Sequence, residues 1–520
     1  MNWLFKKSHL LILLIAVIFV FIFLVRTVGL FNNNILFLFD SARDFLWVKK
    51  IVVDHKFILI GPSSGGLQGY FQGVFWYYLL AIPFAISNGN PLSGPWFMVV
   101  CSIASVTTAF FIFKKIHNIH AAILSSIILG FAGYSVATTQ FIWNPYPIVW
   151  LMPLYFLGIY LLAKHSKWGI MLLSILQGLI MHFEIIYGLG ILPGFLILVG
   201  YFIFKGKQHN KIKTLIISAL LFILPFIPSL LFDMRHQFLM TKSIVTTITT
   251  GGQNLTHKGA PDNLTTRIIL RIDDLKAFTL ESVTTNVLVN YTLFILFLIG
   301  VGIMIRIKKD AQQLTTIVLT TIILLSPFFV FLFLKYSVWG YYWIGTAPLY
   351  AMLLCFGLGF LFEYYKEFRL FWFLAIILLF MYAPWSAINQ WYGGGLVPGY
   401  QVFSTQQRVL NYIYNDAHGE KFSAYEQTPP VYDYVYRYLF WWQGRKYGYI
   451  PTDEKQKNVY VILENVPSDP DAIYFVKNTL HITEAPITTE VFGDPYPKVE
   501  KFIIDPSKEL PVDPNFFPQL

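Results

Sequence analysis

The chain has 520 residues, of which 56% are hydrophobic and only 13% are charged, and its mean hydropathy is +0.58. About a quarter of the residues of an ordinary soluble domain are charged, so this composition excludes a soluble enzyme. Nearly uncharged stretches of about 18 or more residues, long enough to cross a bilayer as a helix, recur along the first three quarters of the chain. The sequence therefore predicts a polytopic α-helical membrane protein.

The net charge of +10 comes from short basic clusters that separate the apolar segments. Six clusters hold 15 of the 38 basic residues, with three acidic residues beside them. They lie at residues 6–7, 114–115, 164–167, 205–213, 306–309 and 366–369. Because Lys and Arg concentrate on the cytoplasmic side of a membrane protein, the charge is a topology signal, and no nucleic-acid partner is expected.

Together, the apolar segments and the basic clusters predict about eleven spans. These are residues 10–30, 92–113, 121–140, 146–163, 169–187, 189–204, 213–232, 287–305, 313–334, 342–362 and 371–388. Every second connection then carries a basic cluster. This pattern places a multi-pass protein in the plasma membrane with its N-terminus in the cytoplasm and its C-terminus outside.

One further apolar segment, residues 73–87, is short, contains Pro83 and is not followed by a basic cluster. We interpret it as an interfacial or partly re-entrant helix, although counting it as a span would reverse the orientation of everything after it. The N-terminal run resembles a signal peptide, but it is long and lacks a small-residue cleavage site. We therefore interpret it as a retained first span.

Two domains are predicted. Residues 1–390 form a transmembrane domain with a first outer loop at 31–91 and a large outer loop at 233–286. Residues 391–520 carry 16 of the 28 acidic residues and form a small extracytoplasmic α/β unit. The expected elements of this unit are helices at 405–415 and 433–442, strands at 422–426 and 459–463, and two strands near Thr489 and Lys501.

The strongest chemical signal opens the first outer loop. Asp40, Arg43 and Asp44 are spaced i, i+3 and i+4, so on a helix they share one face. Phe45 and the apolar residues after it lie largely on another face, as in a helix that lies in the membrane interface. Asp40 follows an unbroken apolar run, where a carboxylate without a function is costly. The alternative is that Asp40 only caps the helix.

A glycine-rich stretch follows at residues 61–73, with five glycines that permit tight turns and close backbone contact with a ligand. It matches neither a P-loop nor a dinucleotide fingerprint. A binding loop and a plain flexible connection both remain open.

These features together resemble the GT-C superfamily of glycosyltransferases. The similarity rests on the first span, the acidic motif that opens the first outer loop, the Gly-Pro and Tyr-Tyr-Leu-Leu stretch before the second span, and the outer C-terminal unit. Within the superfamily, the chain is similar to the protein O-mannosyltransferase and lipid A aminoarabinose transferase group. The resemblance implies that Asp40 is the catalytic base. Those families often have a second acidic residue directly beside this aspartate, whereas here the neighbouring residue is Ser41. Whether Asp44 shares the role of catalytic base therefore stays open.

Other candidate substrate-binding residues lie at the outer ends of predicted spans. They are Arg43, Asn144, His182, Glu184, Asp233, Arg235, His236, Lys335, Tyr341 and Tyr342. Ionisable residues inside a membrane usually face the protein interior or a water-filled cavity. Arg and Lys suit a phosphate, with snorkelling to the interface as the alternative. Asn144 stands where the aminoarabinose transferases have an acid, and a simple Pro-rich turn is its alternative reading.

The sequence thus predicts a glycosyltransferase that moves a sugar, with inversion, from a polyprenyl-phosphate carrier to a hydroxyl of a lipid, protein or polysaccharide acceptor outside the cell. The alternatives are a flippase for lipid-linked saccharides and a non-catalytic protein of cell-envelope assembly. HExxH and CxxC motifs are absent from the sequence. No cofactor is predicted, and a divalent metal is left open.

Overall fold

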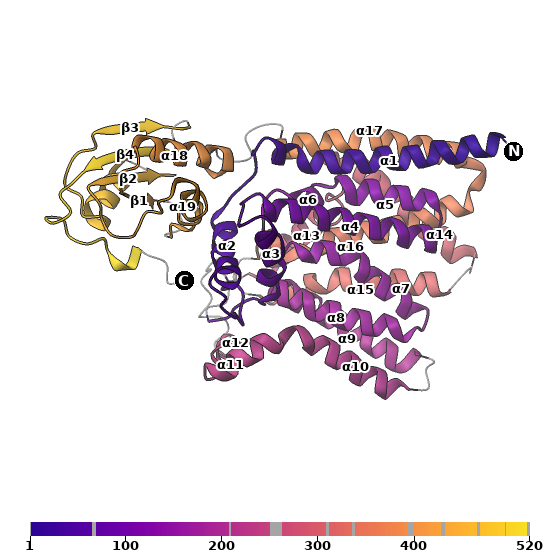
Figure 1. Ribbon diagram of the computed structural model, residues 1–520. Coiled ribbons are helices and arrows are strands. Elements are labelled where there is room, and N and C mark those ends of the chain that lie inside the picture. Colours follow the sequence, from indigo (N-terminus) through magenta and orange to yellow (C-terminus); the bar gives the residue numbers. More distant parts are fainter. Residues whose placement is uncertain are drawn as a thin grey trace.

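The computed structural model describes residues 2–64, 69–206, 210–249, 263–307, 311–334, 338–392, 399–427, 432–464, 469–493 and 496–516. A bundle of roughly parallel helices makes up most of the molecule, and a small α/β unit follows it at the end opposite the N-terminus (Figure 1). This arrangement confirms the predicted fold class of a helical membrane protein with a C-terminal sheet.

The bundle is built from the apolar segments. Its helices are α1 (Asn2–Phe31), α4 (Ser93–Ile116), α5 (Ile119–Phe131), α6 (Gly133–Ala137), α7 (Pro147–Ala163), α8 (Lys167–Phe183), α9 (Ile185–Lys205), α10 (Lys211–Ile223), α14 (Val287–Ile307), α15 (Ala311–Leu332), α16 (Thr346–Tyr364) and α17 (Arg369–Tyr392). Short 3₁₀ turns are η1 (Leu224–Phe226), which joins α10 to α11 (Ile227–Arg235), η2 (Gly340–Trp343) and η3 (Lys366–Phe368).

Among the described residues, eight helices are long and apolar enough to cross a membrane. The shorter helices α5, α7 and α8 run beside them in the bundle (Figure 1). The count of eleven spans therefore stays a prediction. Two predicted boundaries are wrong: the span predicted at 121–140 is divided at Ala132 into α5 and α6, and the break predicted near residue 188 falls at Glu184, whose side chain caps α9 by accepting from the Ile186 N–H.

The division at Ala132 has a partner in α1. Arg26 is almost completely buried, and its guanidinium donates to the carbonyl oxygens of Gly130 at 2.5 Å and Leu129 at 3.5 Å. It also donates to the hydroxyls of Ser102 and Ser135, both at 3.0 Å. These carbonyls belong to the last turn of α5, which has no intrahelical donors for them. Arg26 therefore terminates α5 inside the bundle.

Helix α16 lies at the centre of the bundle and is buried from Thr346 to Phe362. It packs on α5, α7, α14 and α15. Small residues allow close approach at such contacts, as is usual between membrane helices. For example, a Cβ at Gly300 of α14 would collide with the Gly357 carbonyl of α16, and Ser326 of α15 donates at 2.8 Å to the Gly190 carbonyl of α9.

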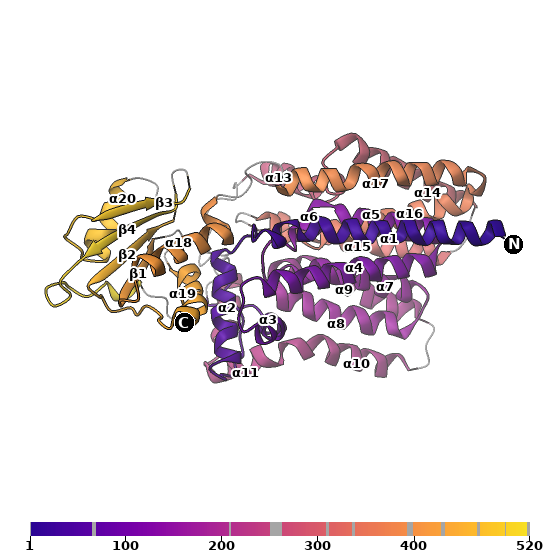
Figure 2. The same cartoon turned by 45° about the horizontal axis from the view of Figure 1, so that its top comes forward.

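The outer-loop helices gather at one end of the bundle. Helix α2 (Phe39–Val52) lies across the bundle axis in both views, with α3 (Phe75–Ile86) packed against it (Figures 1 and 2). Helices α11, α12 (Leu239–Thr249) and α13 (Leu264–Ala277) lie at the same end. Helix α3 is short and apolar, as predicted for segment 73–87.

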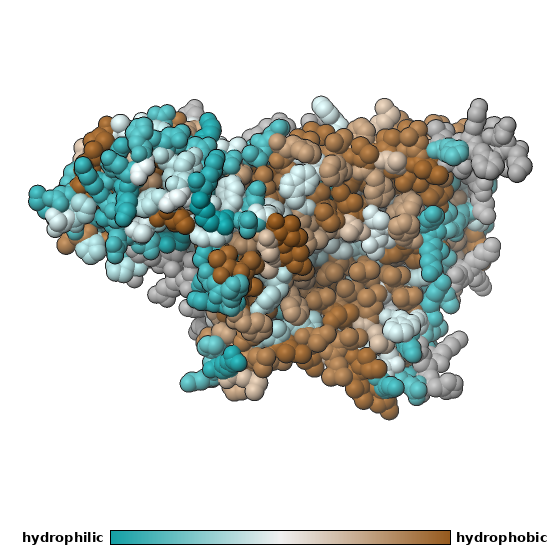
Figure 3. All heavy atoms as spheres, in the orientation of Figure 1, coloured by the Kyte–Doolittle hydropathy of each residue, from teal (hydrophilic) through white to brown (hydrophobic). Residues whose placement is uncertain are grey.

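The basic connections lie at the opposite end, where α4, α7, α9 and α14 finish (Figure 1). In a space-filling view, apolar residues cover the bundle and polar residues cover the C-terminal unit (Figure 3). The surface therefore matches a bilayer-embedded bundle with a solvated unit beyond it. Which end faces the cytoplasm remains a prediction from the charge pattern.

The C-terminal unit is a mixed four-stranded sheet of order β1-β2-β4-β3. Its strands are β1 (Phe422–Gln427), β2 (Asn458–Leu463), β3 (Thr488–Val491) and β4 (Lys498–Ile503), and its helices and turns are η4 (Gly399–Gln401), α18 (Phe403–Asp416), α19 (Tyr434–Tyr447), α20 (Asp469–Tyr474), η5 (Phe475–Thr479) and η6 (Pro514–Phe516). Strands β1 and β2 are parallel and joined through α19, and β4 is antiparallel to both β2 and β3. The sequence predicted the four strands and the two longer helices but not α20.

This unit is joined to the first outer loop by a short antiparallel bridge. The Phe37 N–H donates to the Gln401 carbonyl at 3.0 Å, and the Phe403 N–H donates to the Ile35 carbonyl at 2.9 Å. The Tyr438 hydroxyl of α19 donates at 2.6 Å to the Gly89 carbonyl between α3 and α4. The C-terminal unit is thus attached to both ends of the segment that carries α2 and α3.

Candidate functional site

The acidic motif of α2 forms a chain of charged contacts. The Asp44 side chain is fully buried, and its Oδ2 accepts from the Trp76 indole N–H at 2.6 Å. Its Oδ1 accepts from the Arg43 guanidinium at 2.8 and 3.0 Å. The same guanidinium contacts Asp40 Oδ1 at 2.6 Å. Trp76 of α3 therefore holds Asp44, Asp44 holds Arg43, and Arg43 orients Asp40.

The two carboxyls differ in exposure, and the difference separates their roles. Asp40 keeps 38% of its side-chain surface accessible, whereas Asp44 keeps none. Burial raises the pKa of Asp44 to about 6, although the adjacent Arg43 favours its charged form. Asp40 is therefore the accessible carboxyl of this group, and the buried Asp44 holds Arg43.

The glycine-rich stretch is anchored on the end of α8. The Gly73 N–H donates to the His182 carbonyl at 2.7 Å, and the Phe75 N–H donates to His182 Nε2 at 3.0 Å. A Cβ at Gly73 would collide with the His182 ring, and one at Gly61 would collide with the Gly73 carbonyl. In its described part, this stretch is a packed connection, and the ring nitrogen of His182 is occupied by the start of α3.

Glu184 lies at the junction of α8 and α9 and is also tied to the first outer loop. Its Oε2 accepts from the Gln72 side-chain amide at 3.4 Å, and Gln72 Oε1 accepts from the Ile185 N–H at 3.3 Å. The Tyr341 hydroxyl lies within electrostatic reach of both the Glu184 and Asp40 carboxyls. The structure thus brings together Asp40, Glu184 and Tyr341, which are far apart in the sequence.

Aromatic rings surround Tyr341. Its ring centroid lies 4.5 Å from that of Tyr342 and 4.9 Å from that of Trp143. The neighbour of Trp143, Asn144, donates its amide N–H to the Phe183 carbonyl at 2.8 Å and so caps the end of α8. The described contacts give Asn144 a structural hydrogen bond and pack Trp143 and Tyr342 against Tyr341.

The residues predicted on the seventh span and beyond have different surroundings. Asp233 is buried, and its carboxylate accepts from the Met240 N–H at 2.7 Å. It also accepts from the N–H and the hydroxyl of Thr241, so it caps α12. His236 is exposed and stacks on Phe232 with centroids 3.9 Å apart. Arg235 is exposed at the end of α11. Lys335 lies outside the described residues.

Two arginines of α13 were not singled out from the sequence. Arg267 donates to the Leu332 carbonyl at the end of α15 at 3.0 Å, and Arg271 is buried and paired with Asp274. The Nε atoms of both are buried without a hydrogen-bond partner among the described residues. The sequence signal that could have indicated them is their i, i+4 spacing, which places both arginines on one face of a polar helix in the large outer loop. Sequence position alone did not show that this helix reaches the end of α15.

No protein-family profile and no curated protein sequence matches the chain. Several solved structures match it. The crystal structure of ArnT, a lipid A aminoarabinose transferase, from Cupriavidus metallidurans in the apo state covers 95% of this chain and 98% of its own, with a TM-score of 0.58 and 10% identity. The same protein bound to undecaprenyl phosphate gives a TM-score of 0.56 and 9% identity over 95% of this chain and 98% of its own.

The archaeal oligosaccharyltransferase AglB from Archaeoglobus fulgidus, solved with an inhibitory peptide and a dolichol-phosphate, covers 88% of this chain and 70% of its own at 11% identity and a TM-score of 0.47. The ArnT likeness extends over almost the full length of both chains and includes the C-terminal unit. At this identity, the likeness concerns the fold. The chain therefore has an ArnT-like fold, as the sequence resemblance predicted.

Proposed function

We propose that this protein is a membrane glycosyltransferase that transfers a sugar from a polyprenyl-phosphate carrier to an acceptor hydroxyl. The proposal rests on Asp40, whose accessible carboxylate is held by Arg43. This carboxylate lies at the end of an ArnT-like fold that carries the outer-loop helices. Support for the carrier comes from ArnT, which has been solved with undecaprenyl phosphate.

The reaction needs one displacement. The acceptor oxygen attacks the anomeric carbon, its proton passes to the Asp40 carboxylate, and the bond between the anomeric carbon and the phosphate oxygen breaks. The polyprenyl phosphate leaves with the bonding electrons, and attack opposite the leaving group inverts the anomeric centre. Arg43 keeps the Asp40 carboxylate in place, and the aromatic rings around Tyr341 offer faces on which a sugar ring packs.

The departing phosphate needs a cation, and the end of α15 supplies the best site. Arg267 contacts the Leu332 carbonyl there, and Lys335 follows three residues later in the sequence. A guanidinium with a buried, unpartnered Nε in the described structure retains donors for a phosphate oxygen. Arg235, predicted from the sequence for the same task, is the competing cation on α11.

The proposed activity is tested with purified protein, undecaprenyl-phosphate-linked hexoses and extracts of cell-envelope acceptors. We expect free undecaprenyl phosphate and a glycosylated acceptor to form in equal amounts, measured by mass spectrometry. Binding of the donor with no transfer to any acceptor would contradict the proposal and favour the flippase or assembly alternatives.

Arg267→Gln should weaken the binding of undecaprenyl phosphate at least tenfold, because it replaces the cation beside the phosphate with a shorter, neutral polar side chain. The measurement is the thermal stabilisation of the protein as the lipid is titrated, since a ligand that binds only the folded state raises the Tm by an amount that depends on the ratio of its concentration to its Kd.

Lys276→Gln is the matched control, because Lys276 lies on the same helix in an exposed ion pair with Glu281. It should bind the lipid as the wild type does. If Arg235→Gln abolishes the stabilisation and Arg267→Gln leaves it unchanged, the phosphate lies at the end of α11 and the α15 assignment is wrong.

A further inference from the structure

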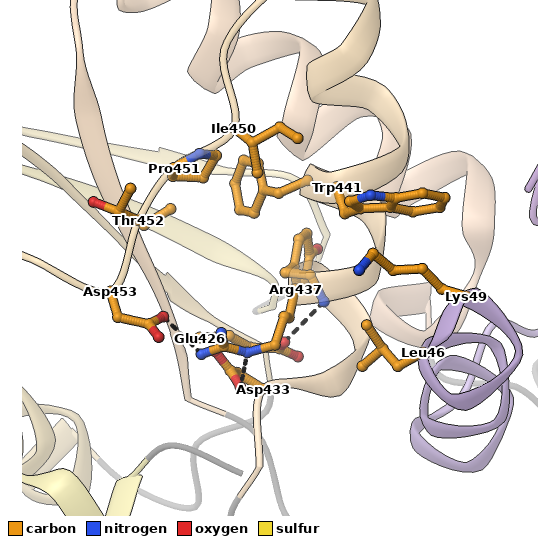
Figure 4. A pocket seen from close by; sticks show the side chains of 13 residues that line it. Leu46, Lys49, Glu426, Asp433, Arg437, Trp441, Ile450, Pro451, Thr452 and Asp453 are labelled. Atoms are coloured by element: carbon orange, nitrogen blue, oxygen red, sulfur yellow. Dashed lines mark hydrogen bonds and ion pairs between the residues drawn. The ribbon is translucent and has the colours of Figure 1, made fainter. Parts of the chain in front are cut away.

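A cavity of about 250 Å³ lies between α2 and the C-terminal unit (Figure 4). Leu46 and Lys49 of α2 form one wall, Trp441 of α19 stands beside them, and the loop of Ile450, Pro451 and Thr452 faces them. Its volume is somewhat below the range of drug-sized pockets, which suits a ligand of one or two rings. Nothing derived above for Asp40 or the phosphate uses this cavity.

Both cations that line the cavity are already paired with carboxylates. Arg437 is held by Asp433 at 2.9 and 3.0 Å and by Asp453 at 2.9 Å. Lys49 is paired with Asp54 at 3.1 Å. The third lining carboxyl, Glu426, is buried and accepts from the Tyr436 N–H at 3.0 Å. A phosphate would meet the aspartates and an ammonium group would meet Arg437 and Lys49, so neither kind of ion is favoured.

The polar groups and the apolar walls together fit a hydroxylated ring. Carboxylates accept hydrogen bonds, ammonium and guanidinium groups donate them, and a hydroxyl does both. Leu46, Ile450 and Pro451 offer apolar surface on which the C–H groups of a sugar pack, and Trp441 stands beside them. The indole is fixed in place by stacking on Phe84, with centroids 5.9 Å apart, and by the Arg445 guanidinium 4.2 Å from the ring centroid.

The cavity has a fixed relation to Asp40. At 1.5 Å and about 100° per residue, Leu46 and Lys49 lie roughly 9 and 14 Å along α2 from Asp40 and on the other side of the helix. Asp433 lines the cavity, while the next residue, Tyr434, packs on Phe39 with ring centroids 4.6 Å apart. A molecule that reaches from the cavity to Asp40 passes the N-terminal end of α2 and must be extended.

We propose that this cavity binds an uncharged saccharide unit of the acceptor, which makes the acceptor an oligosaccharide chain rather than a single small molecule. That the ligand is part of the acceptor rests on the proposed function. That the ligand is a saccharide rests on the cavity alone. The saccharide held between Trp441 and Lys49 is remote from the hydroxyl that reacts, so it contributes to acceptor affinity and not to the chemical step.

The test uses the full-length protein in detergent and saturation-transfer difference NMR. The probes are maltose, cellobiose, chitobiose and mannobiose, with inorganic phosphate and tetramethylammonium as charged comparisons. We expect at least one disaccharide to bind and neither ion to compete with it. Competition by phosphate or by tetramethylammonium would overturn the assignment of a neutral saccharide.

Thr452→Trp should weaken disaccharide binding at least tenfold, because Thr452 is exposed on the cavity loop and a bulky side chain there fills the space without removing a core contact. The matched control is Glu454→Trp, on the same loop but not lining the cavity. In the transfer assay, Thr452→Trp should raise the acceptor KM and leave kcat and carrier binding unchanged. Equal binding by Thr452→Trp and wild type would overturn the proposal.

Failure of this inference is distinguishable from failure of the proposed function. An enzyme that transfers sugar but binds none of the disaccharides overturns the cavity assignment alone. A protein that binds a disaccharide, loses it in Thr452→Trp, and releases no polyprenyl phosphate overturns the proposed transfer alone. Asp40→Asn should bind the disaccharide as the wild type does, because Asp40 does not line the cavity.

Discussion

Asp40→Asn should reduce turnover by roughly 10² to 10⁴, because the amide keeps the size of the side chain but cannot take the acceptor proton. This range corresponds to about 2.7–5.5 kcal/mol of transition-state stabilisation. Carrier binding should stay nearly intact, since the phosphate lies on other residues. The Tm should change little, since Asp40 is partly exposed and the buried Asp44 still holds Arg43. Single-turnover kinetics and lipid titration measure the two quantities separately.

The matched control is Asp54→Asn, which removes a carboxylate just beyond the same helix, where it makes an exposed ion pair with Lys49 at 3.1 Å. Such pairs contribute about 0–1 kcal/mol, and the variant should turn over as the wild type does. Full activity of Asp40→Asn would show that the base is elsewhere, and Glu184, which shares the electrostatic environment of Tyr341, would be the next carboxylate to test.

Arg26→Met should lower the stability of the fold by about 2–5 kcal/mol, because the carbonyls of Gly130 and Leu129 would lose their donor where no water replaces it. Loss of the cation also removes a favourable charge from the C-terminal end of α5. Relief of the cost of burying a guanidinium offsets part of this effect. The measurement is the Tm of the detergent-solubilised protein together with its yield from membranes.

Arg306→Met is the control for an arginine on a membrane helix, because Arg306 is exposed in the last turn of α14. It should unfold at the temperature of the wild type. Arg26→Lys should recover only part of the stability, since an ammonium does not reach four acceptors on two sides. An Arg26→Met protein as stable as the wild type would show that α5 ends at Ala132 for a reason other than this hydrogen bonding.

Much of the fold could be predicted from the sequence because a bilayer imposes simple rules on the chain. Apolar runs had to become helices, the interfacial character of α2 followed from its apolar face, and the strands around Tyr425 and Val461 followed from alternation and turn residues. The boundary failed at Ala132 because the hydropathy of a segment carries no information about a side chain that reaches it from another helix. It failed at Glu184 because hydropathy does not show that a single carboxylate caps a new helix inside an apolar run.

The candidate site could be predicted from the sequence only in part. The spacing of Asp40, Arg43 and Asp44 predicted a shared face, but the separation into one accessible and one buried carboxyl depends on Trp76, which packs against them from α3. The arginines of α13 were missed because their environment is made by the end of α15, about 65 residues away in sequence. Local patterns therefore identified the charged groups, and tertiary packing decided which of them are accessible.

The bridge between residues 35–37 and 401–403 also bears on the order in which the protein is made. At roughly 5–20 residues per second, the ribosome reaches residue 403 on the order of twenty seconds to more than a minute after residue 37. During that interval the Phe37 N–H and the Ile35 carbonyl lack the partners that they have in the folded protein, and the face of α2 that packs on α19 is uncovered. A product truncated before the C-terminal unit should therefore reside in the membrane with part of α2 exposed.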